Sequence, residues 1–166
     1  MKLAISLCSL GLATLLFVGC GKDGASAPVA KSDVLVTTEP QGAVGVGEAR
    51  KTAKDGGEIV LVGRIGGSDK PFVSGMAAFT IVDPKIAPCG AAEGCPTPWD
   101  YCCEPNTVKE NIATIKVNDA SGKPVMTGAN DLLGVKELAT VVVKGTAKTG
   151  EDGSLSVTAK QIFVRN

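Results

Sequence analysis

The stretch TVVVKGTAKTGEDGSLSVTAKQIFVR, residues 140–165, predicts a β-hairpin. Two segments rich in valine and threonine, 140–148 and 155–165, flank the turn sequence GEDG at 150–153. β-Branched residues favour extended backbone, and a glycine-containing turn between two such segments is typical of a hairpin. We therefore expect these two segments to be the last two strands of the fold and to pair with each other.

Three further segments have the composition of strands. EIVLVGRI at 58–65 lies between glycines, MAAFTIVD at 76–83 is apolar on both faces, and NIATIKVN at 111–118 alternates apolar and polar residues. Runs of β-branched and aliphatic residues bounded by turns predict strands. Gly63, inside the first of them, indicates a bulge or a sharp bend of the kind that closed barrels use at corners.

Two short helices complete the expected order of elements. Residues 45–53 precede the first strand, and residues 130–135 separate the third strand from the fourth. Five strands with a short helix between the third and the fourth is the plan of the OB-fold, a partly open Greek-key barrel, whereas a small sandwich usually needs seven strands or more. The predicted fold class is therefore all-β with short helices, a five-stranded OB-fold-like barrel.

The sequence MKLAISLCSLGLATLLFVGC, residues 1–20, has the pattern of an export signal. Lys2 precedes an apolar run that serine, glycine and threonine interrupt, which is more typical of a signal peptide than of a membrane-spanning helix. The ending FVGC resembles a bacterial lipobox, so we expect a signal peptide over residues 1–19 and lipidation of Cys20. The lipid would hold the protein in the cell envelope, on the periplasmic or outer surface. The alternative is a secreted protein in which Cys20 is a free thiol.

Small, polar and charged residues without a helical or strand period dominate residues 20–42. Such a segment has too little apolar surface to offset the entropy lost on ordering, so we predict a flexible tether there and one folded domain over residues 43–166. Within that domain, residues 84–108 form an insert between the second and third strands. This insert is longer than the connections of compact domains usually are, and loops of this length are normally functional or disordered.

Four of the six cysteines lie in the insert, in the sequence CGAAEGCPTPWDYCC: Cys89, Cys95, Cys102 and Cys103. Their spacing lacks the paired C-x2-C of structural zinc sites and the C-x-x-C of redox centres, and the chain has no histidine. In extended backbone, adjacent side chains point in opposite directions, so Cys102 and Cys103 are not expected at one ion.

An exported domain ordinarily keeps such cysteines oxidised. We predict two disulfides, in which Cys102 and Cys103 each reach back to Cys89 or Cys95, and the sequence leaves the connectivity open. No metal and no cofactor is assigned. The alternative is a metal-binding or redox protein that uses the four thiols.

Trp99, Asp100 and Tyr101 are the candidate binding residues of the insert, and they include the only tryptophan and the only tyrosine of the chain. Aromatic rings of this kind often carry binding to a sugar, a peptide or a base. The competing interpretation is structural, with Trp99 covering the barrel mouth or packing on the disulfides. Asp100 is expected either to cap a turn or to ligate an ion.

Composition argues against several classes of function. Without histidine, Ser-His-Asp and Cys-His catalytic arrangements are excluded, and we predict that the protein is not an enzyme. Lys and Arg number 17, as do Asp and Glu, and the two signs are interspersed. A nucleic-acid ligand is therefore not expected, because such binders carry a basic patch.

Sequence motifs add a resemblance to known families. The segments EARKTAKDGGEIVLVGRIGG, AAFTIVD, ATIKV, LATVVVKGTAK and SLSVTAKQIFV resemble the extracytoplasmic OB-fold proteins of bacteria over most of residues 48–164. With its CPTPWDYCC insert, the chain also resembles an uncharacterised lipoprotein family of planctomycete-type bacteria. The first resemblance implies a binding or stress-related role, and the second implies no particular activity. We expect a lipid-anchored binding module without catalytic activity, with an unknown protein or glycan as ligand; the alternative is a structural or envelope-assembly lipoprotein.

Overall fold

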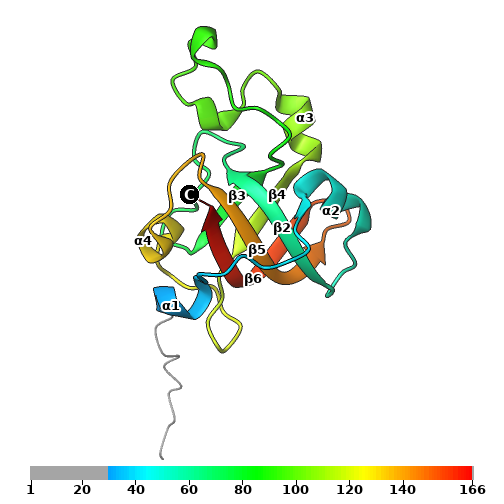
Figure 1. Ribbon diagram of the computed structural model, residues 1–166, viewed down its shortest axis with the longest axis vertical. Helices are drawn as coiled ribbons and strands as arrows, with labels where there is room; N and C mark the ends of the chain where they lie inside the picture. Colours follow the sequence, from blue (N-terminus) through cyan, green and yellow to red (C-terminus); the bar gives the residue numbers. More distant parts are fainter. Residues whose placement is uncertain (1–29, 166) are drawn as a thin grey trace, which may run out of the picture.

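The computed structural model describes residues 30–165 and shows an all-β domain built on a closed five-stranded barrel (Figure 1). Around the barrel the strands follow the order β2, β3, β4, β6 and β5, and β5 pairs with β2 to close it. The pair β4–β6 is parallel, and the other barrel pairs are antiparallel. The barrel strands are β2 Glu58–Ile65, β3 Ala78–Val82, β4 Ile112–Lys116, β5 Thr140–Thr149 and β6 Leu155–Arg165.

This order confirms the predicted OB-fold-like class. The hairpin of β5 and β6 forms as expected, and a short helix lies between the third and fourth barrel strands. The cysteine-rich insert connects the second barrel strand, β3, to the third, β4. The short elements outside the insert are α1 Lys31–Val34, β1 Val44–Gly45, α2 Val46–Thr52 and α4 Ala129–Leu133.

Alternation along the strands builds the core. Phe79 and Ile81 of β3 point into the barrel together with Ile115 of β4, and all three are fully buried. The opposite face of β3 is also apolar, and there Val82 belongs to a second, smaller cluster with Tyr101 and residues of the insert. The two apolar faces of β3 therefore serve two different cores, one inside the barrel and one beneath the insert.

The irregularity expected at Gly63 lies elsewhere. β2 pairs with β5 over residues 58–64 in unbroken register, and the register shift occurs between Lys144 and Gly145, where β5 pairs with β6. Gly63 instead leaves room for the side chain of Ile81, because a Cβ at position 63 would lie only 2.7 Å from that side chain. Of the two predicted features at Gly63, a bulge or a sharp bend, the bulge was wrong. A glycine inside a strand marks either a bulge or the close approach of a neighbouring side chain, and the sequence alone does not distinguish them.

The predicted tether also differs from the structure. Residues 30–41 lie against the barrel: Val34 is buried, Leu35 forms a parallel bridge with Ile162 of β6, and the backbone N–H of Val36 donates to the Ile162 carbonyl at 2.9 Å. Composition alone predicted that the entropy lost on ordering would keep this segment flexible. Packing of the short apolar sequence VLV at 34–36 against the barrel offsets that entropy. The domain therefore begins before residue 43, and the signal peptide, Cys20 and the start of the tether lie outside the described residues.

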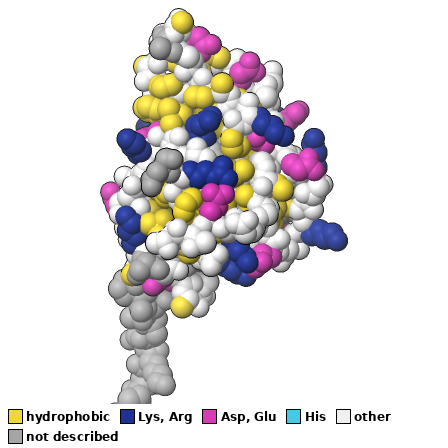
Figure 2. Space-filling model, viewed as in Figure 1, with side chains coloured by type: hydrophobic (Ala, Val, Ile, Leu, Met, Phe, Trp, Pro, Cys, Tyr) yellow, Lys and Arg dark blue, Asp and Glu magenta, His cyan; other side chains and the backbone are white. Residues whose placement is uncertain are grey.

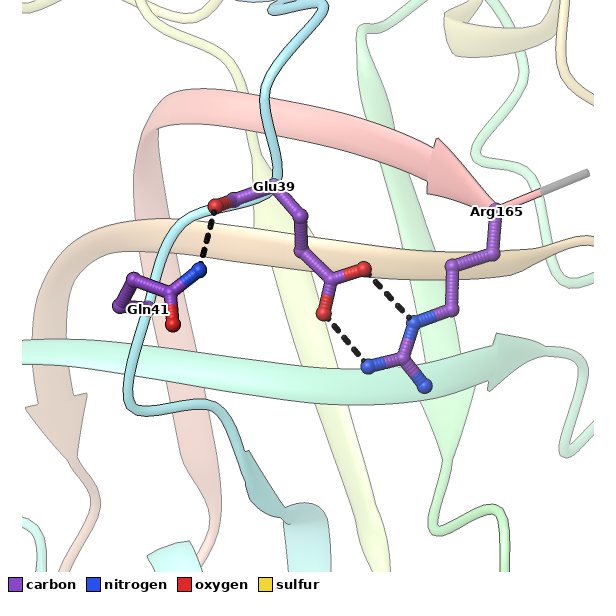
Figure 3. A network of polar contacts seen from close by, with 3 residues as sticks. All are labelled: Glu39, Gln41 and Arg165. Atoms are coloured by element: carbon purple, nitrogen blue, oxygen red, sulfur yellow. Dashed lines mark hydrogen bonds and ion pairs between the residues drawn. The ribbon is translucent and has the colours of Figure 1, made fainter.

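A bidentate ion pair holds the end of this segment (Figure 3). The Glu39 carboxylate accepts hydrogen bonds from Nη2 and Nε of Arg165 at 2.6 and 3.1 Å, and Gln41 donates to the Glu39 carbonyl. The guanidinium lowers the pKa of the Glu39 carboxyl below its usual value. The N-terminal segment is thus attached to β6, and α1 lies at the end of the molecule opposite the insert (Figure 1).

Replacing Gly145 by alanine should destabilise the barrel. The added Cβ would collide with the Thr158 carbonyl and lie 2.8 Å from a methyl group of Val157. We expect Gly145→Ala to lower the free energy of unfolding by about 1–3 kcal/mol, as overpacking of a core typically does. Urea denaturation followed by circular dichroism measures the change. The matched control is Gly90→Ala, whose Cβ has nothing closer than 3.8 Å; an equal loss in both variants would contradict the prediction.

Candidate metal centre

Three short turns of helix shape the insert. They are η1 Ala91–Glu93, η2 Pro98–Asp100 and α3 Pro105–Glu110. Proline occupies the first position of both η2 and α3, where its fixed φ and missing N–H are well tolerated. The insert therefore has local order, although its sequence shows no helical or strand period.

A left-handed residue separates η2 from the adjacent cysteines. Tyr101 has φ of 57° and ψ of 36°, a conformation rare for residues with a side chain. Asp100 supports the turn, because one carboxylate oxygen accepts the backbone N–H of Cys102 at 2.8 Å and the other accepts the Thr97 hydroxyl at 2.7 Å. The chain is thus turned, not extended, where it enters Cys102 and Cys103.

The four cysteine sulfurs of the insert converge on one point. All four Sγ atoms lie within 4.8 Å of one another. The distances from Cys102 are 3.0 Å to Cys95, 3.6 Å to Cys89 and 3.9 Å to Cys103, and Cys95 lies 3.8 Å from Cys103. Four sulfurs placed tetrahedrally at 2.3 Å from one ion would be about 3.8 Å apart. The sulfur positions therefore approximate the ligand set of a single tetrahedral ion.

This geometry corrects the prediction of two disulfides. All four cysteines are free, and even the closest pair, at 3.0 Å, is well beyond a bonded S–S distance of about 2.05 Å. The prediction failed because it assumed extended backbone at Cys102 and Cys103. Cys102 and Cys103 are instead the central residues of a β-turn, in which the Glu104 N–H donates to the Tyr101 carbonyl at 2.9 Å, so the two adjacent side chains reach the same point.

Proton affinities within the cluster show how strongly the thiols interact. Contacts with Cys95 and Cys89 raise the pKa of the Cys102 thiol to about 12. The pKa of the Cys103 thiol is raised as well, chiefly by Cys89 and then by Glu93, whereas the backbone N–H of Cys103 lowers the pKa of Cys89. Without a cation, neighbouring thiols resist joint ionisation; a divalent ion reverses this balance because it stabilises thiolates.

The donor set matches zinc best. Thiolates select soft ions such as zinc and copper(I), and a four-coordinate tetrahedral site is the usual structural zinc geometry. An iron–sulfur cluster contains several iron atoms and needs its cysteine sulfurs farther apart than a single ion does. Among residues 30–165, these four cysteines are the only cluster of three or more ligand-type side chains with this proximity.

The three candidate binding residues have structural contacts within the chain. The Trp99 indole N–H donates to the Asp69 carbonyl at 3.1 Å, and the Trp99 carbonyl accepts the Gly67 N–H at 2.7 Å, so this residue joins the insert to the β2–β3 loop. Tyr101 is 1% exposed and packs with Val82. Asp100 caps the turn, as one interpretation proposed, and its partners Thr97 and Cys102 lower the pKa of its carboxyl.

Sequence reasoning missed Glu93. Its carboxylate accepts the Gly90 N–H at 2.6 Å and lies 3.3 Å from the Cys103 sulfur. A cavity of about 340 Å³ opens beside these groups, lined in part by Glu93, Cys103 and Glu104. The signal for Glu93 was its place between Cys89 and Cys95, but a lone exposed glutamate in a loop is too common to single out.

Comparison with known proteins adds no family: the chain matches no protein-family model and no curated protein. Within residues 30–165 the helices are too short to span a bilayer. The resemblances noted in the sequence therefore remain predictions.

The buried hydroxyl of Tyr101 allows a stability test of the insert. This oxygen has no hydrogen-bond partner among the described residues, so it contributes a desolvation cost without a compensating contact. We expect Tyr101→Phe to leave the free energy of unfolding unchanged or slightly higher, whereas Tyr101→Ala should lower it by about 3–5 kcal/mol through loss of the ring. Denaturant titration of both variants measures this. A clear loss in Tyr101→Phe would show that the hydroxyl does have a partner.

Proposed function

We propose that this protein is a lipid-anchored binding module of the cell envelope whose cysteine-rich insert is folded around one metal ion, zinc by preference. The observation that carries the proposal is the convergence of the four cysteine sulfurs, from three separate parts of the insert, within 4.8 Å. Four thiolates complete a tetrahedral shell and leave no position open for a substrate. The proposed role of the ion is therefore structural.

The insert needs such an ion because its own core is small. In the part of the chain that the structure describes, the cluster beneath the insert has only three buried members, Val82, Tyr101 and Val108. Most residues from 90 to 107 are exposed or half-buried. Small units with too few buried apolar side chains commonly depend on a metal or a disulfide for order, and this supports a structural metal.

The end of the molecule that carries the insert is the proposed contact surface for a protein or glycan partner. Four small apolar residues of the insert are exposed there, namely Ala87, Ala92, Pro96 and Pro105. Figure 2 shows hydrophobic side chains gathered toward this end. A metal that fixes the loop would preorganise the surface and reduce the entropy lost on binding.

Metal content tests the proposal directly. The mature exported protein, purified under reducing conditions with zinc, should hold one zinc ion per chain by elemental mass spectrometry. Replacement of zinc by cobalt(II) should give the absorption of a tetrahedral thiolate complex. We expect Cys95→Ser to weaken zinc binding by more than the roughly 10- to 100-fold that loss of an outer-shell partner costs.

A cysteine-independent control is Ser121→Ala, far along the chain in an exposed turn, which should retain full zinc binding. Removal of zinc should leave the circular dichroism of the barrel unchanged, because the barrel core is separate from the cluster beneath the insert. A chain that holds no zinc, and whose intact mass rises by four hydrogens on reduction, would contradict the proposal and restore the two-disulfide interpretation.

Glu93 should oppose metal binding. Its carboxylate lies 3.3 Å from the Cys103 sulfur, and four thiolates with one zinc ion already carry a net negative charge. Glu93→Gln removes this repulsion and offers an amide N–H to the thiolate, so zinc affinity should rise about tenfold in chelator competition. Glu104→Gln is the matched control, because Glu104 lines the same cavity but bonds to Thr107. Equal effects in both variants would refute a specific role for Glu93.

A further inference from the structure

The four sulfurs of the proposed metal centre are also placed to form disulfides. We propose that oxidation expels the metal and joins Cys95 to Cys102 and Cys89 to Cys103, so that the insert has a metal-bound state and a disulfide-bonded state. This inference rests on the proposed function, because it concerns the regulation of the same site. It also accounts for a cluster of four free thiols in a chain whose sequence predicts an export signal.

Access of oxidants to the site follows from exposure. Cys102 and Cys103 are exposed, Cys95 is half-buried, and only Cys89, at 8% exposed, is shielded. A sulfur that solvent reaches also meets dissolved oxidants, and exposed thiolates are the ones that react first. The centre is therefore chemically accessible, unlike a zinc site enclosed in a core.

Sulfur distances select the pairing. Cys95 and Cys102 are the closest pair at 3.0 Å, so their sulfurs need to approach by only about 1 Å to reach bonding distance. Their union leaves Cys89 and Cys103, whose sulfurs lie within 4.8 Å of each other.

The other pairings are less favourable. A bond between Cys89 and Cys102 starts from 3.6 Å and then requires Cys95 and Cys103 to join from 3.8 Å. A bond between the adjacent Cys102 and Cys103 closes a strained ring of few atoms. The proposed pairing is favoured because its first bond, between Cys95 and Cys102, starts from the shortest sulfur–sulfur distance and does not close the strained ring of adjacent cysteines.

The reaction balances with a two-electron oxidant of the peroxide class. Each disulfide forms when two thiolates lose two electrons in total, and one hydrogen peroxide takes up these electrons with two protons to give two water molecules. Two peroxide molecules and four protons thus convert the four-thiolate zinc site into two disulfides, four water molecules and one free zinc ion. A dithiol reductant reverses the covalent change and permits zinc to bind again.

The experiment uses the exported mature chain loaded with one zinc ion. Met126, which is 73% exposed, is replaced by leucine so that sulfoxide formation there does not confuse the mass. Hydrogen peroxide is added stepwise, released zinc is followed with a chromogenic chelator, and the unreduced insert peptide is sequenced by tandem mass spectrometry. The Cys102→Ser variant provides a check on pairing, because it leaves Cys95 without its proposed partner.

The expected result is one zinc ion released for every two peroxide molecules consumed, fragments that join Cys95 to Cys102 and Cys89 to Cys103, and recovery of zinc binding after dithiol treatment. In Cys102→Ser, Cys89 should still bond to Cys103. Zinc that stays bound, cysteines converted to sulfinic acid, or a different pairing would overturn the inference and leave the metal centre standing. A chain that never binds zinc would overturn the proposed function itself.

Discussion

The left-handed turn at Tyr101 determines both the position and the chemistry of the insert. Its ring fills the space beside Val82 on the outer face of β3, which attaches the insert to the barrel. Its backbone, supported by the Asp100 carboxylate, turns the chain so that Cys102 and Cys103 face the sulfurs of Cys89 and Cys95. A residue with a Cβ adopts this conformation at some cost, so the buried ring and the surrounding contacts must compensate for it.

Most of the barrel could be predicted from the sequence because its strands depend on local pattern. β-Branched residues in 58–65 and 155–165 form β2 and β6 within those bounds, and the glycine-containing turn at 150–153 joins the last two strands. Alternation also placed Ile115 and Val117 inside. These features require only neighbours along the chain and the period of a strand.

The cysteine site could not be predicted in the same way, because it depends on a single backbone conformation. A pattern of spacings does not reveal that Tyr101 is left-handed or that Cys102 and Cys103 are the centre of a β-turn, and in extended backbone the adjacent cysteines would diverge. The prediction for the N-terminal segment failed for a related reason. The apolar residues of VLV at 34–36 are too few to predict a contact with the barrel, yet Leu35 pairs with Ile162 of β6. In both places a long-range partner decides the local structure.

The attachment of residues 30–39 to β6 limits the reach of an anchored molecule. Between Cys20 and Ala30 lie nine residues, which span about 30 Å at most when fully extended. If the proposed lipid is attached to Cys20, this length would keep the barrel near the bilayer, and the insert lies at the end of the domain away from α1. In an anchored molecule, metal ions, oxidants and partners that approach the insert from solution would then meet it on the side of the domain away from the attached N-terminal segment.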